Sequence, residues 1–482
     1  MIKPIHTLLS LLAVGALCSL TMLVFPKDGL KLGKHITLEF ETWDSFLAAD
    51  TLSDAPIENI VEFLDIYTVE VDSIAIQDSL LREEAIRRQA MMRLQYDVNN
   101  TQALNKFFKA LYAVETDKSK SVRVLHYGDS QIEGDRITGY LRNELQKKYG
   151  GTGPGFVHIT EVIPTLAIDQ DASESWYRYT INGRKDTTVK HNRYGLLAHF
   201  NRFTPISTEW PEDTLVNAWL EYKPGRMTYS RSKKWTRARL MFGQVEKPFF
   251  IDASANGIQL SADSIGVDEP FSTLEWNFES TPTDLKLEVK GELSPEFYGI
   301  SFDSPTGIHV DNIPLRGSSG TLFKKISKAQ LQAQYNELEI GLIILQFGGN
   351  TVPYIQSVKE ADRYGNWFKS QITYLKSMVP NASFMVIGPS DMATKDKDHF
   401  VTRPFLPEVR DALKRACFEK GCAFWDIYEV MGGRNSMQSW VNADPPLAGR
   451  DYTHFTPAGA KRIAELLNIA IQEDYTAWKE AK

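Results

Sequence analysis

The chain has 482 residues, enough for two or three domains, and its composition of 43% hydrophobic and 24% charged residues is that of a globular protein. The formal net charge is −7, from 54 Lys and Arg against 61 Asp and Glu, and no basic cluster stands out. This balance argues against a nucleic acid as partner.

The cysteines, Cys18, Cys417 and Cys422, are too few for a disulfide framework, and no Cys/His set has the spacing of a zinc site. Cys417 and Cys422 could pair in an oxidising compartment. We favour two buried apolar thiols.

The N-terminus carries an uncharged, apolar run from Thr7 to Phe25. As a helix this run would span roughly 28 Å, about one membrane hydrocarbon core. We expect residues 1–26 to be an uncleaved signal-anchor rather than a cleaved signal peptide, because apolar residues continue past the possible cleavage sites. Under either interpretation, we expect the rest of the chain to be exported. The uncleaved form places it at the periplasm or cell envelope, tethered to the inner membrane by residues 7–25.

Residues 27–120 are predicted to form a stalk with a helical extension. Asp54–Asp78 is acidic with scattered aliphatic residues. The amphipathic pattern over Leu81–Tyr96 and the apolar stripe over Thr101–Val114 predict two helices.

From Ser121 onward, strand patterns alternate with helix patterns. A β-branched run at Ser121–Tyr127 ends in Gly128-Asp129-Ser130, and a helical pattern follows as far as Gly150. The alternation returns late in the chain, with predicted strands at 340–345, 384–387 and 423–427 and predicted helices at 361–378, 407–419 and from 457 onward. This order predicts a parallel α/β sheet built from residues 121–157 and 298–482.

Residues 158–297 have a different character, with many short runs and turn signals. Five of the ten tryptophans lie there: Trp176, Trp210, Trp219, Trp235 and Trp276. The stretch Leu274–Val289 alternates as a strand, turn and strand would. We predict an inserted β-sandwich whose core takes up most of these tryptophans.

Three polar motifs lie where predicted strands end or where the last helix begins: Gly128-Asp129-Ser130, Gly348-Gly349-Asn350 and Asp451-Tyr452-Thr453-His454. Ligands of an open parallel sheet bind at the carboxyl ends of its strands, so we expect these motifs to meet. Ser130 is the candidate nucleophile, since a position at the start of a helix would aim its own N–H at a developing oxyanion. The alternative is a simple helix cap.

His454 is the candidate general base and Asp451 the carboxylate that orients it. Thr456 suits a helix N-cap and Pro457 the first helical position, which would hold this loop in place. A rival pair with the same spacing, Asp396 and His399, lies in a highly charged segment that we interpret as a solvated loop.

Two further groups are candidates for the oxyanion site. The side-chain amide of Asn350 and a backbone N–H near Gly317 could donate hydrogen bonds there. The alternative for both is an ordinary glycine-containing turn.

Together these residues resemble the SGNH/GDSL hydrolase superfamily, whose four blocks match in order at Ser130, Gly317, Asn350 and His454. The resemblance covers 121–157 and 298–475. It implies a flavodoxin-like, three-layer α/β hydrolase, here interrupted by the inserted β-sandwich and preceded by the stalk and the membrane anchor. It also implies that the chemistry requires no metal or organic cofactor.

Two positions depart from the family's pattern. Gln131 replaces the usual Leu after the serine, which we expect to matter little. Thr351 follows Asn350 where many members have Asp or Glu, which leaves the support of the oxyanion pocket open.

A β-sandwich between the first and second blocks resembles the bacterial peptidoglycan O-acetylesterases, whose insert looks like a carbohydrate-binding module. This resemblance implies a serine esterase that hydrolyses O-acyl esters, most simply O-acetyl esters, on cell-envelope polysaccharide. Three alternatives stay open: a polysaccharide O-acetyltransferase with the same triad, a lipase or thioesterase, and a non-catalytic, membrane-tethered glycan-binding protein. The sequence indicates no oligomeric state.

Overall fold

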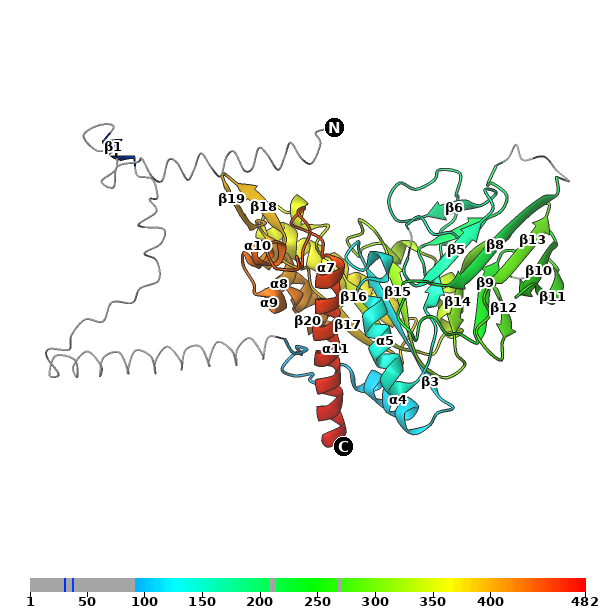
Figure 1. The fold of residues 1–482 in the computed structure, drawn as a ribbon, viewed down its shortest axis with the longest axis horizontal. Helices are drawn as coiled ribbons and strands as arrows, with labels where there is room; N and C mark the ends of the chain where they lie inside the picture. Colours follow the sequence, from blue (N-terminus) through cyan, green and yellow to red (C-terminus); the bar gives the residue numbers. More distant parts are fainter. Residues whose placement is uncertain are drawn as a thin grey trace. The chain divides into compact units, whose positions relative to one another are not determined.

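The computed structural model describes residues 92–163, 165–207, 211, 214–267 and 270–482, together with the backbone of two short strands near the N-terminus. These strands, β1 (Leu30–Lys31) and β2 (Thr37–Leu38), pair antiparallel within a first unit, Met1–Arg82. A second unit, Glu83–Lys482, holds every other described element (Figure 1). The predicted anchor at 7–25 lies outside the described residues, and among the described residues no helix is long and apolar enough to cross a membrane.

A five-stranded parallel sheet forms the centre of the second unit, in the order β15-β3-β16-β17-β20. The bounds are Ser121–Gly128 for β3, Gly307–Pro314 for β15, Ile340–Gln346 for β16, Ser383–Ile387 for β17 and Ala423–Trp425 for β20. Numbered along the chain this order is 2-1-3-4-5, the flavodoxin-like arrangement, with its switch point between β3 and β16. The strands are buried almost throughout, as their continuous apolar runs indicate. The predicted parallel α/β sheet is confirmed.

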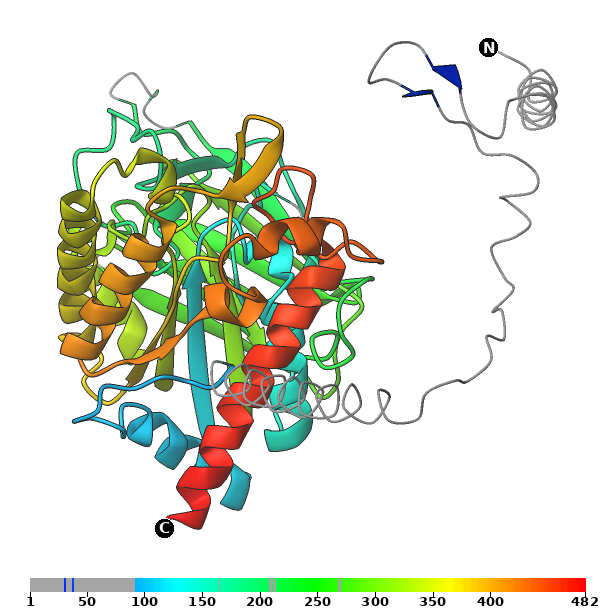
Figure 2. The ribbon, with the colours of Figure 1, turned by 90° about the vertical axis from the view of Figure 1, so that its left-hand side faces the viewer.

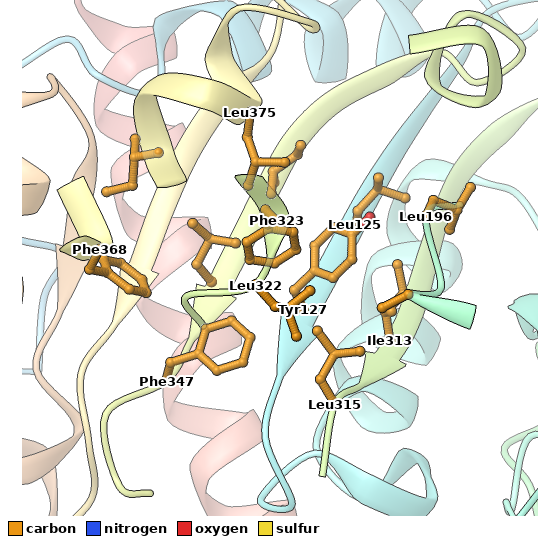
Figure 3. Close-up of a cluster of buried hydrophobic side chains, with 14 of the residues drawn as sticks. Leu125, Tyr127, Leu196, Ile313, Leu315, Leu322, Phe323, Phe347, Phe368 and Leu375 are labelled. Atoms are coloured by element: carbon orange, nitrogen blue, oxygen red, sulfur yellow. The ribbon is translucent and has the colours of Figure 1, made fainter. Parts of the chain in front are cut away.

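Helices cover both faces of this sheet, and Figure 2 shows α7 and α8 on one side and α11 on the other. One layer contains α4 (Asn105–Thr116), α5 (Thr138–Tyr149), α9 (Ile427–Met431), α10 (Ser436–Val441) and α11 (Pro457–Glu480). The other contains α6 (Lys328–Asn336), α7 (Val358–Lys376) and α8 (Leu406–Glu419), with the short 3-10 helices η2 (Phe323–Lys325) and η3 (Val352–Tyr354). Strand residues alternate between the two cores: Val124 faces the first, and Tyr127 faces the second. In the second core Tyr127 packs edge-to-face on Phe323, with ring centroids 5.1 Å apart (Figure 3).

The fold takes in part of the segment predicted as a stalk. Helix α4 matches the predicted helix at 101–114 and buries Phe107, Phe108 and Leu111 in the first core. The predicted helix Leu81–Tyr96 is wrong for its described part, residues 92–96. There the backbone of Gln95 exchanges hydrogen bonds of 2.8 and 2.9 Å with Phe424 at the free edge of β20. A sheet edge that offers unpaired N–H and C=O groups outweighs the local helical pattern.

Between β3 and β15 the chain forms two antiparallel sheets (Figure 1). One contains β5 (Ile168–Ala172), β8 (Val216–Pro224), β10 (Phe249–Ala255), β11 (Ile258–Ile265) and β13 (Leu285–Gly291). The other contains β4 (Gly155–Val157), β6 (Tyr177–Thr180), β7 (His199–Arg202), β9 (Arg237–Gly243), β12 (Ser272–Asn277) and β14 (Glu296–Asp303). Buried residues of both sheets share one core. The sheets therefore pack face to face as a sandwich, while the domain limits 158–297 stay a prediction.

The predicted strand–turn–strand at 274–289 is real as two strands, but these do not form a hairpin. β12 pairs with β9 in one sheet, and β13 pairs with β8 and β10 in the other. The tryptophans divide similarly: Trp235 and Trp276 are buried in the core, Trp176 and Trp219 are half-buried, and Trp210 lies outside the described residues.

A buried ion-pair network joins the sandwich to the parallel sheet. Asp303, at the end of β14, accepts hydrogen bonds from Arg123 of β3, from Arg237 Nε at 2.8 Å and from Arg239 Nη2 at 3.2 Å. Arg123 also binds Asp311 of β15 at 2.7 Å. Burial would raise the pKa of Asp303, but the surrounding arginines and His309 hold it far below its usual range. The carboxylates and arginines of this network therefore neutralise one another only when all of them are present.

Cys417 and Cys422 are both buried free thiols, so the preferred interpretation of these two cysteines is confirmed. The Cys417 thiol donates to the carbonyl oxygen of Ala423 at 3.2 Å.

Candidate active site

Three of the predicted site residues form a hydrogen-bonded relay beyond the carboxyl end of β3. Ser130 Oγ lies 2.7 Å from His454 Nε2, and His454 Nδ1 lies 2.7 Å from Asp451 Oδ2. The carboxylate can only accept, so Nδ1 carries the hydrogen and Nε2 faces the serine hydroxyl as an acceptor. Burial would raise the pKa of Asp451, but hydrogen bonds from His454 and Thr453 keep it below its usual range. Asp451 therefore stays ionised beside the imidazole at neutral pH.

The loop that carries Asp451 and His454 is shaped by local hydrogen bonds. Oδ1 of Asp451 accepts from the backbone N–H groups of Thr453 and His454 at 3.0 and 3.1 Å, and Tyr452 between them has a left-handed backbone with φ of 54°. Thr456 then caps α11 through the N–H of Gly459, as predicted. These contacts turn both side chains of the pair to the same side.

The rival histidine does not reach the site. His399 is exposed and pairs with Asp396 across the hairpin of β18 (Ala393–Asp396) and β19 (His399–Thr402). This hairpin supports the site loop instead, since Phe400 stacks on Tyr452 with ring centroids 3.6 Å apart. The segment is exposed at His399, as expected of a solvated segment, but it forms a β-hairpin rather than the predicted loop.

Ser130 does not start a helix, contrary to the expectation from sequence. It lies in a turn before the 3-10 helix η1 (Glu133–Asp135), and α5 begins only at Thr138. The left-handed residues Gly134 and Asp135, with φ of 70° and 66°, break the helical path. The Ser130 N–H donates to no acceptor among the described residues, so it can serve an oxyanion without support from a helix end.

Two residues that hold the serine turn against the histidine loop were not foreseen. Arg136 donates to the carbonyl oxygens of Ser130 at 2.7 Å and Phe455 at 2.9 Å. Gln131, expected to matter little, donates to the carbonyl of Thr453 at 2.7 Å and accepts from the N–H of Phe455 at 3.3 Å. Its amide thus fixes the backbone on both sides of the histidine.

The predicted oxyanion donors line the same cavity, in two different states. Gly317 has φ of 75°, and its N–H has no acceptor among the described residues. Asn350 Nδ2 donates to Asp129 Oδ2 at 3.1 Å and to the Ser318 carbonyl at 3.2 Å. Both amide hydrogens are therefore engaged, and Asn350 must exchange one of these bonds to reach an oxyanion.

Asp129, between the glycine and the serine of the first motif, is buried beside this amide. Burial raises the pKa of its carboxyl to about 6, although hydrogen bonds from Gln131 and Asn350 and the charge of His454 oppose the rise. The unfolded chain would titrate near 3.9. Between roughly pH 4 and 6 the folded state therefore binds more protons, and the stability that this group contributes falls as the pH rises through that window.

We predict that Asp129→Asn removes this pH dependence. The substitution loses a hydrogen bond at every pH, but its free energy of unfolding should improve relative to wild type by about 3 kcal/mol between pH 4 and pH 7. Urea unfolding of both proteins across this range measures the difference. A difference that stays constant with pH would contradict the assignment.

These groups surround an open cavity of about 570 Å³ at the carboxyl ends of four parallel strands. Its walls combine apolar surface with polar side chains, which include Ser130, Glu133, Arg136, Arg316, Asn350, Ser390 and His454. The position matches the switch point of a flavodoxin-like sheet. Ser130 and Gly317, whose N–H groups have no acceptor among the described residues, both line this cavity.

No family model and no curated protein matches the sequence. A solved peptidoglycan O-acetylesterase has a TM-score of 0.60 and 20% identity, and the match covers 77% of this chain and 96% of that one. A family two carbohydrate esterase from Clostridium thermocellum, solved with cellohexaose, has a TM-score of 0.25 and 12% identity over 55% of this chain and 93% of that one. An acetyl xylan esterase has a TM-score of 0.27 and 14% identity, and the match covers 34% of this chain and 81% of that one.

At 20% identity this likeness is one of fold alone. More particularly, the chain shares the fold of a peptidoglycan O-acetylesterase over most of both chains.

Proposed function

We propose that this protein is a serine esterase of the SGNH type that removes O-acetyl groups from polysaccharide. The observation that carries the proposal is the relay from Ser130 Oγ through His454 to Asp451, with both bonds at 2.7 Å, beyond the end of a parallel strand. The fold shared with a peptidoglycan O-acetylesterase supports peptidoglycan as the first substrate to test.

In the proposed reaction, His454 Nε2 takes the proton of Ser130 Oγ as that oxygen attacks the ester carbonyl. The N–H groups of Ser130 and Gly317 receive the oxyanion, and each donor of this kind is worth roughly 3 kcal/mol. His454 then returns the proton to the leaving sugar oxygen. A water molecule, activated by the same imidazole, releases acetate from the acyl-serine.

The walls of the cavity favour a short acyl group on a polar alcohol. A lipase or thioesterase would need a long apolar channel, whereas this cavity is open and has charged and amide side chains among its lining residues. Transfer of the acetyl group to a sugar hydroxyl uses the same residues, so the O-acetyltransferase alternative is a question of which acceptor reaches the acyl-serine.

We extend the proposal to the sandwich and to the location. The outer face of its five-stranded sheet has an open cavity of about 580 Å³, lined by Trp219, Phe250, Asp252 and Glu288. Aromatic faces beside carboxylates suit the stacking and hydrogen bonding of a sugar chain, which supports a carbohydrate-binding role. The apolar run at 7–25 supports tethering to the inner membrane, with residues 27–482 in the periplasm.

Acetate release tests the proposed function. The full chain is assayed on p-nitrophenyl acetate, p-nitrophenyl palmitate, O-acetylated peptidoglycan and acetylated xylan, with and without a sugar acceptor. We expect turnover of the acetyl esters and none of the palmitate. Acetyl-sugar formation at the expense of acetate would assign a transferase. No reaction with any ester would leave only the glycan-binding alternative.

A further prediction concerns Gln131. Replacing it with Leu removes the hydrogen bonds that the side-chain amide makes to the backbone of Thr453 and Phe455, on both sides of His454. We therefore expect kcat to fall about 10- to 100-fold with a smaller change in KM. Gln131→Glu keeps the acceptor for the Phe455 N–H but loses the donor to the Thr453 carbonyl. Its kcat should lie between those of wild type and Gln131→Leu. Steady-state kinetics with an unfolding midpoint for each variant provide the measurement, and the exposed Gln438→Leu is the control. Unchanged kcat in Gln131→Leu would refute this positioning role.

A further inference from the structure

A second cavity, of about 450 Å³, adjoins the catalytic one. The two cavities share wall residues, including Glu133, Gly134 and Arg316. On one side the second cavity is bounded by Pro314 at the end of β15 and the residues after it. On the other it is bounded by the sandwich, including β6. A substituent of a glycan whose ester lies at Ser130 can therefore extend into it.

Arg178 of β6 lines this second cavity, and its side chain lacks an anionic partner. Among the described residues no carboxylate lies within ion-pair distance of it, and the nearest polar contact is His199 Nδ1, 3.4 Å from Nη2. That nitrogen lies 3.0 Å from the carbonyl oxygen of Leu197, so it carries a hydrogen and cannot accept another. The guanidinium thus keeps its donors for a group inside the cavity.

The surroundings of Arg178 balance its charge only in part. Burial lowers the pKa of Arg178, which reflects a cation with reduced solvation. Glu161 on the same wall attracts it, but burial raises the pKa of that carboxyl to about 7, so a part of it is uncharged at neutral pH. The rings of His158 and His199 are tilted by 33° with centroids 4.5 Å apart, and burial holds the pKa of both far below the usual value, which keeps them neutral.

The other two arginines in these walls form ion pairs. Arg142 forms a buried ion pair with Asp135 at 2.7 Å. Arg316 lies 3.5 Å from Glu133, and both residues line both cavities. A desolvated charge without an ion-pair partner is unfavourable. Arg178 is therefore the cation of this cavity with which a bound anion would form an ion pair.

We propose that the second cavity is a subsite for a carboxylate of the glycan whose ester is cleaved at Ser130, with Arg178 as the group that binds it. The inference rests on the proposed esterase function and narrows its substrate to an acidic glycan. A planar guanidinium holds a carboxylate through two parallel N–H···O bonds, which fixes the sugar as well as attracting it. The carboxylate can come from the peptide-bearing unit of peptidoglycan or from a uronic acid.

The test compares the full chain with Arg178→Gln, Arg178→Lys and Arg226→Gln. Arg226 is the matched control, because its side chain is 91% exposed on the sandwich and pairs with Asp169 outside both cavities. The substrates are p-nitrophenyl acetate, a neutral acetylated xylo-oligosaccharide, an O-acetylated muropeptide and an O-acetylated oligouronate. The measurement is kcat/KM for each, and the two acidic substrates distinguish the two sources of carboxylate.

For Arg178→Gln we expect kcat/KM on an acidic substrate, relative to p-nitrophenyl acetate, to fall about 10- to 100-fold through KM, the size of a lost charged hydrogen-bond pair. Arg178→Lys should recover part of the loss, and Arg226→Gln should match wild type. An equal loss on neutral and acidic substrates, or no loss at all, overturns the subsite. Wild type that is inactive on every ester, p-nitrophenyl acetate included, refutes the esterase function instead.

Discussion

Replacing Ser130 or His454 with alanine is expected to lower kcat for acetyl-ester cleavage by at least about a thousandfold. Ser130 supplies the bond-forming oxygen, and His454 must accept its proton at a distance of 2.7 Å. Because the two act as one unit, the double variant should be no slower than the slower single variant. The residual rate would come from the oxyanion donors and substrate binding.

Acetate release and p-nitrophenol release at saturating substrate measure this effect. The matched control is His399→Ala, since that histidine has the same Asp-x-x-His spacing but lies exposed on the β19 hairpin. His399→Ala should retain wild-type kcat. If His399→Ala is inactive while His454→Ala is active, the relay seen in the structure is not the catalytic one. Losses that multiply in the double variant would likewise contradict a single coupled unit.

The second large effect concerns stability. Asp303→Asn is expected to lower the free energy of unfolding at neutral pH by about 3–5 kcal/mol, because it leaves Arg123, Arg237 and Arg239 without their shared carboxylate in a buried joint. The folded-state pKa of Asp303 is strongly lowered, so its stabilisation is present above the unfolded value near 4 and is lost as the pH falls below it. The deficit of the variant should therefore shrink in acid.

Urea unfolding at pH 7 and at pH 3 compares Asp303→Asn with wild type. Asp169→Asn is the control, because its pair with Arg226 joins the same residue types on the surface of the sandwich, where such pairs contribute about 1 kcal/mol or less. Equal losses in the two variants would show that burial of the Asp303 network does not matter.

Much of the fold could be predicted from local sequence patterns. The apolar run at Ile340–Leu345 became a strand buried on both faces, and Thr456 with Pro457 marks the start of α11. The relay of Ser130, Asp451 and His454 was predictable because strand ends of a parallel sheet share one edge. The i, i+3 spacing of the acid and the base also fits a single turn.

The features that the sequence did not predict depend on contacts between residues far apart in the chain. Gln131 bonds to a carbonyl 322 residues along the chain, and no local pattern announces such a contact. The helix expected to reach Tyr96 gave way to pairing with β20, another long-range contact. The left-handed pair Gly134 and Asp135 moved the helix start away from Ser130. Nothing near Arg178 in sequence shows that its charge faces a cavity.

The position of the sandwich within the chain also sets an order of events during synthesis. β3 lies at the interior of the parallel sheet, yet its neighbour β15 comes after the whole sandwich, so that Arg123 and its partner Asp311 are 188 residues apart. At about 5–20 residues per second, β3 leaves the ribosome some 10–40 s before that neighbour exists. The sandwich can collapse in this interval, whereas the central strand must wait unpaired. Export of the chain before folding, or a chaperone that covers Ser121–Gly128, would protect this apolar strand from aggregation.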